Sequence, residues 1–393
     1  MRLSVPPFLL RLGFAIVRRV APFLPLGRRL IVTRYLDVTE VLARDTDFTI
    51  ATINGPKIDR LDGPFILGLD RGAIYDREAS LLHAVVADGD LARIASTVAS
   101  EAVRQIDAAR GNHRIDVAGS YARTIATRLV GTYFGVATAD ETTLATWLRA
   151  IFWDIFLNPG DDVSVRDRAT LANAALSEHL DADILRRRAA PARTDDVLGR
   201  LLARAQTLPW LDDRSVRRNI AGTIVATVDN TVTLFTTSLV ELLRRPDAHA
   251  RAREAALGGD RETVRRYLYE AGRFTPAAPF LLREASRDLV IASGTRRARR
   301  VASGTRLVLA TCSAMFDPDG FADPNAFDID HDAGALHFGA GLHRCLGARI
   351  NAVVLPELAM ALVRLPSLHL ASGPDGTIAF EGPFPHRLVV EFA

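Results

Sequence analysis

The feature that most constrains this fold is a long helical stretch over residues 213–245, which ends immediately before Pro246. Its middle, residues 220–243, is apolar on nearly every side. A helix without a polar face has to be covered by other elements on all sides. The stretch therefore predicts a protein organised around one central helix.

Helical periodicity also marks residues 37–44, 76–109, 138–157 and 171–188. After Pro276 the pattern changes to short apolar runs between glycine turns, which predict strands at residues 289–291, 306–310, 368–370, 378–380 and 388–392. Helices followed by small sheets predict a mainly α fold of the α+β class. Because the chain has no internal repeat and no low-complexity linker, residues 30–393 are expected to form a single domain.

Composition excludes several classes of protein. The 393 residues are 48% apolar and 24% charged, as in an ordinary globular protein. The 49 basic residues exceed the 46 acidic ones by only 3, so no nucleic-acid partner is expected. The two cysteines, Cys312 and Cys345, are too few for a disulfide framework or a four-cysteine zinc site. A reducing, cytoplasmic setting is expected.

Residues 1–29 form an apolar and basic N-terminal arm. Arg11, Arg18 and Arg19 interrupt its apolar run, so it lacks the roughly 20 apolar residues that a membrane-spanning helix needs. No small-residue cleavage site of a secretory signal follows the apolar part. We expect an arm packed on the domain, and a weak peripheral membrane contact through a basic amphipathic segment is the second interpretation.

The most informative stretch is residues 338–347, FGAGLHRCLG, followed by a helical run from about Ala348. Glycines on both sides of Cys345 permit tight turns and the close approach of a flat ligand. The start of a helix lowers the pKa of a nearby thiol, and its free amides can hydrogen-bond the sulfur. The other interpretations are a buried structural cysteine and a zinc site formed by His337, His343 and Cys345, which lacks an evident fourth ligand.

This stretch resembles the proximal-ligand loop of the cytochrome P450 superfamily, FGxGxHxCxG, at all six fixed positions. The resemblance implies the P450 fold, with heme b (iron protoporphyrin IX) between the central helix and the helix after the loop. It implies that Cys345 is the axial thiolate of the heme iron and that His343 contacts a heme propionate. Phe338 would shield the sulfur, and Gly339 and Gly347 would shape the cofactor loop. A thiolate ligand favours oxygen activation over oxygen storage.

Other stretches are similar to further motifs of the family. Glu270 and Arg273 are close enough to pair on one helix face, and they resemble the ExxR ion pair that buttresses the cysteine loop. Residues 321–328 resemble the meander that approaches this loop, with His331 where an arginine is commoner. Arg283 lies where family members place a propionate-binding arginine, and a surface arginine is the alternative.

The central helix aligns residues 226–231 with the family's AGxET(T) segment, which places Ala226 at the heme and Asp229 at the acid position. Asn230 falls where the family usually has a threonine, so Asp229, Asn230 and Thr231 are the candidate catalytic residues for proton delivery. An amide does not exchange protons as a hydroxyl does, and Thr231 is turned away by about a quarter of a circle. Three interpretations account for the missing threonine hydroxyl: Asn230 anchors a relay water, the substrate supplies a hydroxyl, or peroxide is the oxidant. We favour the relay water.

Two departures from the family pattern concern other helices. Arg77 and His83 are candidates for the propionate-binding pair of an early helix, although their spacing is unusual, and solvated charges are the alternative. Pro356 lies inside the helix that follows the cysteine loop and should kink or divide it.

By their position in the family, several apolar side chains should line the substrate pocket, although each can equally belong to the core. They are Phe65, Ile66, Leu67, Phe152, Trp153, Ile155, Phe156, Val225, Ala226, Ala278, Phe280 and Leu281. Lys57 and Arg60 are candidates for anchoring a substrate carboxylate, with a solvated loop as the alternative.

We therefore expect a cytochrome P450 monooxygenase that inserts one oxygen atom from O2 into an apolar small molecule. The chain carries no flavin or iron–sulfur motif, so a separate ferredoxin or flavodoxin with its reductase is expected to supply electrons. Arg344 and Arg349 would present a basic face to that partner. The alternatives are a peroxide-driven peroxygenase, a non-catalytic heme-binding sensor or scaffold and, last, a zinc hydrolase. A monomer is expected.

Overall fold

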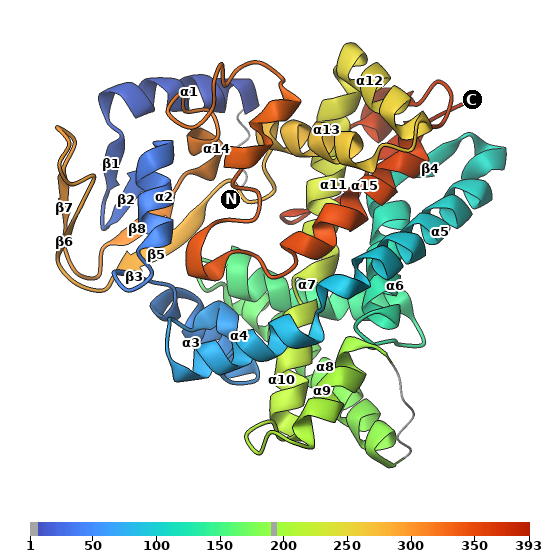
Figure 1. Cartoon of the computed structure of the whole chain (residues 1–393), viewed down its shortest axis with the longest axis horizontal. Coiled ribbons are helices and arrows are strands. Elements are labelled where there is room, and N and C mark those ends of the chain that lie inside the picture. Colours follow the sequence, from blue (N-terminus) through green and yellow to red (C-terminus); the bar gives the residue numbers. More distant parts are fainter. Residues whose placement is uncertain (1–6, 190–194) are drawn as a thin grey trace. The chain divides into compact units, whose positions relative to one another are not determined.

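The computed structural model describes residues 7–189 and 195–393, and most of this chain is helical with small sheets, as predicted (Figure 1). It divides into two compact units. Unit 1 contains the described residues up to Ile53 together with Thr237–Ala348, and unit 2 contains the described residues of Asn54–Thr236 together with Arg349–Ala393. The expectation that residues 30–393 form a single domain stays a prediction.

Unit 1 is built on a sheet whose five strands come from distant parts of the sequence. In order they are β1 (Phe23–Leu26), β2 (Arg29–Val32), β8 (Arg306–Leu309), β5 (Leu281–Ala285) and β3 (Phe48–Thr49). Strand β2 pairs in parallel with β8, and Figure 1 shows the blue N-terminal strands beside the orange ones. Both strands alternate exposed and buried residues, so one face of the sheet packs on the core.

The remaining elements of unit 1 surround this sheet or carry the candidate site. They are α1 (Pro7–Val20), α2 (Tyr35–Ala43), α12 (Pro246–Leu257), α13 (Arg261–Phe274), β6 (Leu289–Ile291), β7 (Arg299–Val301), α14 (Thr311–Ala314), η5 (Ile329–Gly334) and η6 (Gly341–His343).

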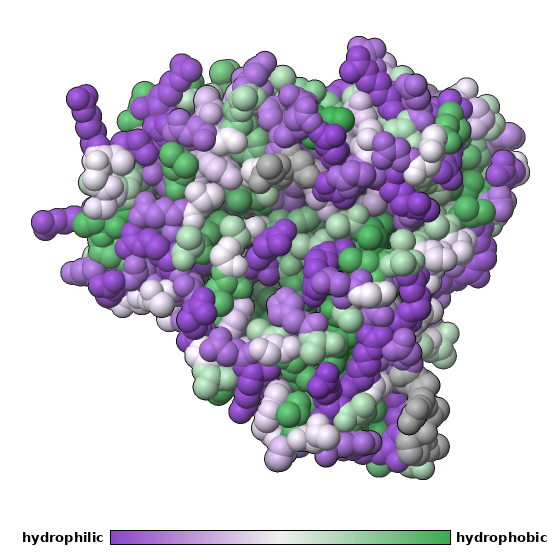
Figure 2. Space-filling model, viewed as in Figure 1, coloured by the Kyte–Doolittle hydropathy of each residue, from purple (hydrophilic) through white to green (hydrophobic). Residues whose placement is uncertain are grey.

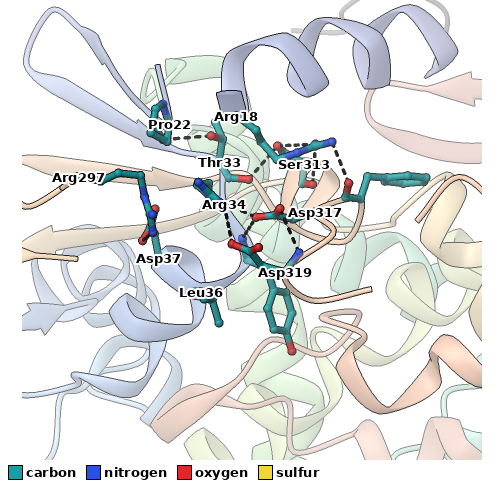
Figure 3. Close-up of polar contacts among 12 residues, drawn as sticks. Arg18, Pro22, Thr33, Arg34, Leu36, Asp37, Arg297, Ser313, Asp317 and Asp319 are labelled. Carbon is teal, nitrogen blue, oxygen red and sulfur yellow. Dashed lines mark hydrogen bonds and ion pairs between the residues drawn. The ribbon is translucent and has the colours of Figure 1, made fainter. Parts of the chain in front are cut away.

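The N-terminal arm is tied to unit 1 by Arg18 (Figure 3). The Arg18 guanidinium donates to the carbonyl of Ser313 at 2.9 Å and to that of Phe316 at 2.8 Å. The Ser313 hydroxyl in turn donates to the carbonyl of Thr33 at 2.8 Å. This geometry favours the interpretation of a packed arm over residues 7–29, whereas residues 1–6 lie outside the described chain.

Unit 2 is mostly helical, and its few strands form two small sheets. Its helices are α3 (Ala51–Leu61, which begins in unit 1), α4 (Ala73–Val85), α5 (Leu91–Ala109), α6 (Arg123–Thr132), α7 (Glu141–Leu157), α8 (Val163–Ala189), α9 (Val197–Ala205) and α10 (Asp213–Ile224). One sheet has the order β4 (Arg114–Asp116), β12 (Val389–Glu391), β9 (His369–Leu370), and the other is the hairpin of β10 (Ala379–Glu381) and β11 (Phe384–Arg387). The short helical turns are η1 (Ile66–Gly68), η2 (Asp88–Asp90), η3 (Arg110–Asn112), η4 (Val117–Ala122) and η7 (Gly373–Gly376).

The prediction of one unbroken helix over residues 213–245 is wrong. Helix α10 ends at Ile224, and α11 begins at Thr227 and runs to Leu243. Two hydroxyls compete for backbone carbonyls at this break: Thr223 donates to Asn219 O at 2.7 Å, and Thr227 donates to Thr223 O at 3.3 Å. Such bonds bend helices. The expected burial is confirmed, since the middle of α11 is fully buried at Val228, Val232 and Phe235.

The helix predicted over residues 76–109 is also divided. Helix α4 ends at Val85, and the turn η2 at Asp88–Asp90 precedes α5. Aspartate and glycine favour local turns over a continuing helix, which explains the interruption. The helices predicted over residues 37–44, 138–157 and 171–188 are confirmed as α2, α7 and α8.

The five strands predicted after Pro276 are confirmed within two residues as β6, β8, β9, β10 and β12. The strands β1 to β5, β7 and β11 were not predicted, because short strands are defined by partners that lie far away in sequence. Helix α15 (Ala348–Val363) runs unbroken through Pro356, so the proline does not divide it. Within the described residues, no helix is long and apolar enough to cross a membrane.

Candidate functional site

The loop over residues 338–347 owes its shape to glycine in unit 1. Gly339 and Gly341 have φ angles of +64° and +71°, which other residues rarely adopt. A Cβ atom on Gly341 would lie 2.0 Å from the Leu42 carbonyl oxygen, so no side chain fits there. The Cys345 amide closes the loop by donating to Phe338 O at 3.0 Å.

The sulfur of Cys345 is presented at the start of α15. Cys345 is exposed, and the backbone amides of Gly347 and Ala348 favour the charged form of its thiol. Burial raises the pKa of this thiol, while the two amides and the charge of Arg344 oppose that rise. Cys312 differs, because burial raises the pKa of its thiol to about 12. Of the two, Cys345 is the more accessible, and access is typical of a cysteine that binds a metal.

The donor set at this loop fits a ligand held by one sulfur. Among the residues that the structure describes, no three His, Cys, Asp or Glu side chains come together to hold a metal ion, which contradicts the zinc site of His337, His343 and Cys345. A heme iron needs only one axial protein ligand of this kind. His343 lies in η6 and is half-buried, as is Phe338, whose ring centroid is 5.8 Å from that of Tyr269.

Glu270 and Arg273 form a closed ion pair on α13. Arg273 Nε and Nη2 donate to the two carboxylate oxygens at 2.7 and 2.6 Å, and its other donors reach the carbonyls of Met315, Pro324 and Ala326. His331 Nδ1 lies 3.2 Å from Glu270 Oε1. The pair therefore holds the chain directly at Met315, Pro324 and Ala326, and His331 is a third side chain in this cluster.

Arg283 lies on β5 with only 6% of the residue exposed, so it is not the surface arginine considered above. Its Nη1 donates to the carbonyl of Leu282 at 2.8 Å. Burial of a guanidinium requires polar partners, which keeps Arg283 a candidate for binding a charged group.

In unit 2, Asp229 follows directly after the break between α10 and α11. It is 4% exposed, and its Oδ1 accepts from Arg123 Nη1 at 2.8 Å and from Arg149 Nη2 at 3.0 Å. Arg149 also bonds Glu381 of β10, which is 59% exposed. Two arginines and one surface carboxylate thus surround the candidate acid, and sequence analysis had no signal for any of the three.

The residues next to Asp229 in sequence differ in their exposure. Asn230 is exposed, and Ala226 is half-buried at the break. Thr231 is 4% exposed, and its hydroxyl donates to Asn351 Oδ1 of α15 at 3.2 Å. Thr231 is therefore engaged in the packing of two helices, as its turn away from Asn230 predicted.

Arg77 and His83 have other contacts in unit 2. The Arg77 guanidinium lies over the Trp210 ring, 4.6 Å from its centroid. His83 is exposed, with its Nδ1 3.4 Å from Arg349 Nη2, and Arg349 is paired with Asp88. These contacts fit solvated surface charges better than propionate ligands.

Five of the predicted substrate residues meet at one small pocket in unit 2. They are Phe65, Leu67, Ile155, Phe156 and Val225. The Phe65 ring packs so closely on the helix that a Cβ atom on Gly222 would lie 2.6 Å from it. A second pocket, of about 340 Å³, lies among α5, α6 and α7, and none of the predicted residues lines it.

The other predicted pocket residues have core or surface roles. The Phe152 ring packs 4.9 Å from Phe156 and 6.0 Å from Phe384. In unit 1, Phe280 lies 6.3 Å from Phe14, and the carbonyl of Ala278 accepts from Thr311.

Two charged residues, Asp62 and Arg218, line the small pocket, and neither was among the predicted anchors. Lys57 donates to the carbonyls of Asp154 and Asn158 at 2.8 and 2.6 Å, and Arg60 pairs with Asp154, so both predicted anchors are engaged elsewhere. Arg218 of α10 lines the pocket instead. Its side chain is 11% exposed and pairs with the fully buried Glu78, while its Nε has no hydrogen-bond partner.

Known proteins resemble this chain over most of its length. The chain is 28% identical to the mycinamicin IV hydroxylase/epoxidase of Micromonospora griseorubida over 371 residues, which cover 90% of this chain and 86% of that protein. It is 27% identical to the cyclomarin C epoxidase CymV of Salinispora arenicola (strain CNS-205) over 338 residues, which cover 84% and 80%.

Solved structures have the same fold. The crystal structure of CalO2 superposes with a TM-score of 0.83 at 22% identity and covers 98% of this chain and 96% of that one. The structure of CYP109E1 from Bacillus megaterium with testosterone has a TM-score of 0.80 at 18% identity and covers 97% and 99%. The sequence model of the family described as "Cytochrome P450" matches residues 165–365, about half of the chain. The chain therefore belongs to the cytochrome P450 family, whose cofactor is heme, and is a P450 monooxygenase.

Proposed function

We propose that this P450 binds heme b through Cys345 and inserts one oxygen atom from O2 into an apolar small molecule. The observation that carries the proposal is the exposed Cys345, held in a glycine loop beside two backbone amides that favour its charged form. The thiolate is the form that binds a metal. When bound, heme supplies oxygen activation and oxygen-atom transfer. His343 and Arg283 are proposed to hold the propionates, and Phe338 to shield the sulfur.

The test compares the two cysteines. We expect Cys345→Ala to lose the absorption spectrum of a thiolate-ligated heme and all product formation. Cys312→Ala, the matched control, should keep both, because its thiol is buried. A Cys345→Ala protein that keeps the wild-type spectrum contradicts the proposal.

We further propose that Asp229 exchanges protons at its carboxylate and that Asn230 holds a relay water with its exposed amide. Both carboxylate oxygens of Asp229 accept from arginine, so one of these bonds has to loosen before a proton can bind there. The measurement is product formed per NADH consumed. Asn230→Thr should raise this ratio, and an unchanged ratio contradicts a handicap in proton delivery at Asn230.

The substrate is proposed to be an apolar molecule with one anionic or hydrogen-bond-accepting group. The bulky apolar ligands named for relatives, such as testosterone, support the apolar part. The pocket beside Arg218 holds about 40 Å³, and one water needs roughly 10–15 Å³, so it suits a carboxylate-sized group. A screen for shifts of the heme absorption band should favour free acids over their methyl esters. Tighter binding of the esters contradicts a role for Arg218.

Electrons are proposed to come from an acidic ferredoxin or flavodoxin and its reductase, which docks near the exposed Arg344. Arg349, paired with Asp88, would contribute less charge than its sequence position suggests. If docking is electrostatic, turnover at low partner concentration should fall as salt is added. Product formation with hydrogen peroxide alone, at a rate equal to that with the partners, would favour a peroxygenase instead. A cytoplasmic monomer stays our expectation.

A further inference from the structure

Helix α1 turns two arginines toward the protein and exposes a row of apolar side chains. Arg18 is 9% exposed and points toward Ser313 of the same unit (Figure 3). The carbonyls of Ser313 and Phe316 accept its hydrogen bonds. The Arg11 guanidinium lies over the ring of Phe316, 5.3 Å from its centroid. Burial lowers the pKa of both guanidinium groups. The inward side of the helix therefore carries two of its three arginines.

The opposite side of α1 is apolar and exposed. Leu12, Ile16 and Val20 are 59%, 56% and 75% exposed. Successive members are four residues apart, so they are only about 40° apart around the helix, and Ile16 lies nearly opposite Arg18. We call Leu12, Ile16 and Val20 the α1 stripe. Leu26 of the following strand is exposed as well, at 61%.

Other exposed large apolar side chains of the described residues do not form such a row. Figure 2 shows one face of the molecule, on which apolar residues lie among hydrophilic ones. On α8, for example, Leu171 and Leu185 are 73% and 71% exposed but 14 positions apart. Single exposed apolar residues are normal, whereas a contiguous row indicates an interaction surface.

The charges beside the stripe favour an anionic lipid surface over a protein partner. Arg19 is exposed on α1, and Arg28 and Arg29 are exposed next to Leu26. The first 29 residues contain no acidic residue, so the segment that carries the stripe does not itself repel phosphate groups. A helix with an apolar face and flanking arginines lies flat at the lipid interface, where arginine reaches the headgroups. None of the described helices is able to span a membrane.

We propose that the α1 stripe docks the enzyme on the surface of an anionic lipid bilayer. The apolar side chains enter the boundary between headgroups and acyl chains, and Arg19, Arg28 and Arg29 contact the headgroups. Arg18 holds the helix against unit 1, so that docking does not require α1 to leave the protein. This proposal is independent of the heme ligand and of the substrate.

The test is flotation of the holoenzyme with vesicles of phosphatidylcholine alone or mixed with phosphatidylglycerol. We expect binding to the anionic vesicles and at least tenfold weaker binding by Leu12→Ser/Ile16→Ser/Val20→Ser. The control Leu171→Ser/Leu185→Ser removes apolar side chains of similar exposure from α8 and should bind like the wild type. Arg19→Gln should weaken binding to anionic vesicles only.

Three outcomes would overturn the proposal. The first is that the wild type does not float with anionic vesicles at low salt. The second is that the triple variant binds as well as the wild type. The third is that the α8 control loses as much binding as the triple variant. The heme absorption spectrum of each variant checks that it is folded. The stripe would instead be assigned to a second copy of the chain by a different result. In that result neither protein binds vesicles, the wild type is a dimer in solution and the triple variant is a monomer.

Discussion

Two buried carboxylates, Glu270 in unit 1 and Asp229 in unit 2, are each held by arginine, yet their surroundings differ. The partner of Glu270, Arg273, has a side chain that is 1% exposed, and backbone carbonyls take its remaining donors. Asp229 shares Arg149 with Glu381, which is 59% exposed. The Glu270–Arg273 ion pair is therefore closed to water, whereas the ion pairs of Asp229 connect it through Arg149 to an exposed carboxylate. We infer that the first serves the fold, while the second leaves room for a change of partners.

The largest effect should come from opening the closed cluster. Removing one partner of a buried ion pair leaves the other charge uncompensated and costs about 3–5 kcal/mol. We therefore expect Arg273→Ala to lower the free energy of unfolding by that amount in urea unfolding experiments on the holoprotein. Arg265→Ala, on the same helix, breaks a pair with the 65% exposed Glu262 and should cost about 1 kcal/mol or less. Equal losses in the two variants would show that closure of the cluster is unimportant.

Asp229→Asn should have a smaller effect on stability and a larger one on chemistry. The amide keeps the volume but not the charge, so two arginines lose a charge-assisted partner, which costs about 1–3 kcal/mol. Product formed per NADH consumed should fall several-fold, because an amide does not exchange protons at this position. Asp375→Asn, at an exposed carboxylate paired with Arg387, is the control. An Asp229→Asn enzyme with the wild-type ratio would remove Asp229 from proton delivery.

Asp90 offers a third buried carboxylate and tests arginine pairing through pH. Hydrogen bonds from Arg200, and then from Arg93 and Tyr133, hold the pKa of Asp90 well below its ordinary value despite its burial. A lowered pKa stabilises the fold at pH above about 4, and this contribution is lost as the pH falls from there toward the lowered pKa. Asp90→Asn should therefore cost about 1–3 kcal/mol at pH 7 and clearly less near pH 3. A difference in unfolding free energy that is independent of pH would contradict this account.

The smallest effect is expected at the exposed end of the Asp229 cluster. Glu381→Gln breaks a pair whose acid is largely exposed, so it should change the free energy of unfolding by less than about 1 kcal/mol. Arg149 would then be held by Asp229 alone, and product formed per NADH consumed should fall by less than in Asp229→Asn. A fall as large as that of Asp229→Asn would place Glu381 in the proton path itself.

Much of the unit 1 site followed from local spacing. The glycines at 339 and 341 predicted a loop that approaches its surroundings closely, and the structure confirms positive φ angles at both. The three-residue spacing of Glu270 and Arg273 predicted their pairing, which is confirmed. These predictions succeeded because the backbone itself brings the residues together. The break at Val225 and Ala226 was missed, because apolar periodicity continues through residues whose neighbouring threonines bond the backbone.

The partners of Asp229, by contrast, had no local signal. Arg123 lies 106 positions before it, and Arg149 lies 80 before it. In a chain with 49 basic residues, nothing in the sequence distinguishes these two from the others. The pairing of Arg218 with Glu78, which are 140 positions apart, also had no local signal. Nor did the sequence indicate which side of α1 faces the protein.

The sequence by itself determined the chemistry that this protein offers: one cysteine beside glycines, an acid followed by an amide, and helices that the apolar periodicity could locate. Only the tertiary structure decided which charges are closed off and which reach the surface, and it turned the arginines of α1 inward and its apolar residues outward. The physical reason is that spacing along the chain controls contacts within a few residues, whereas burial and pairing depend on which distant segments the fold packs together.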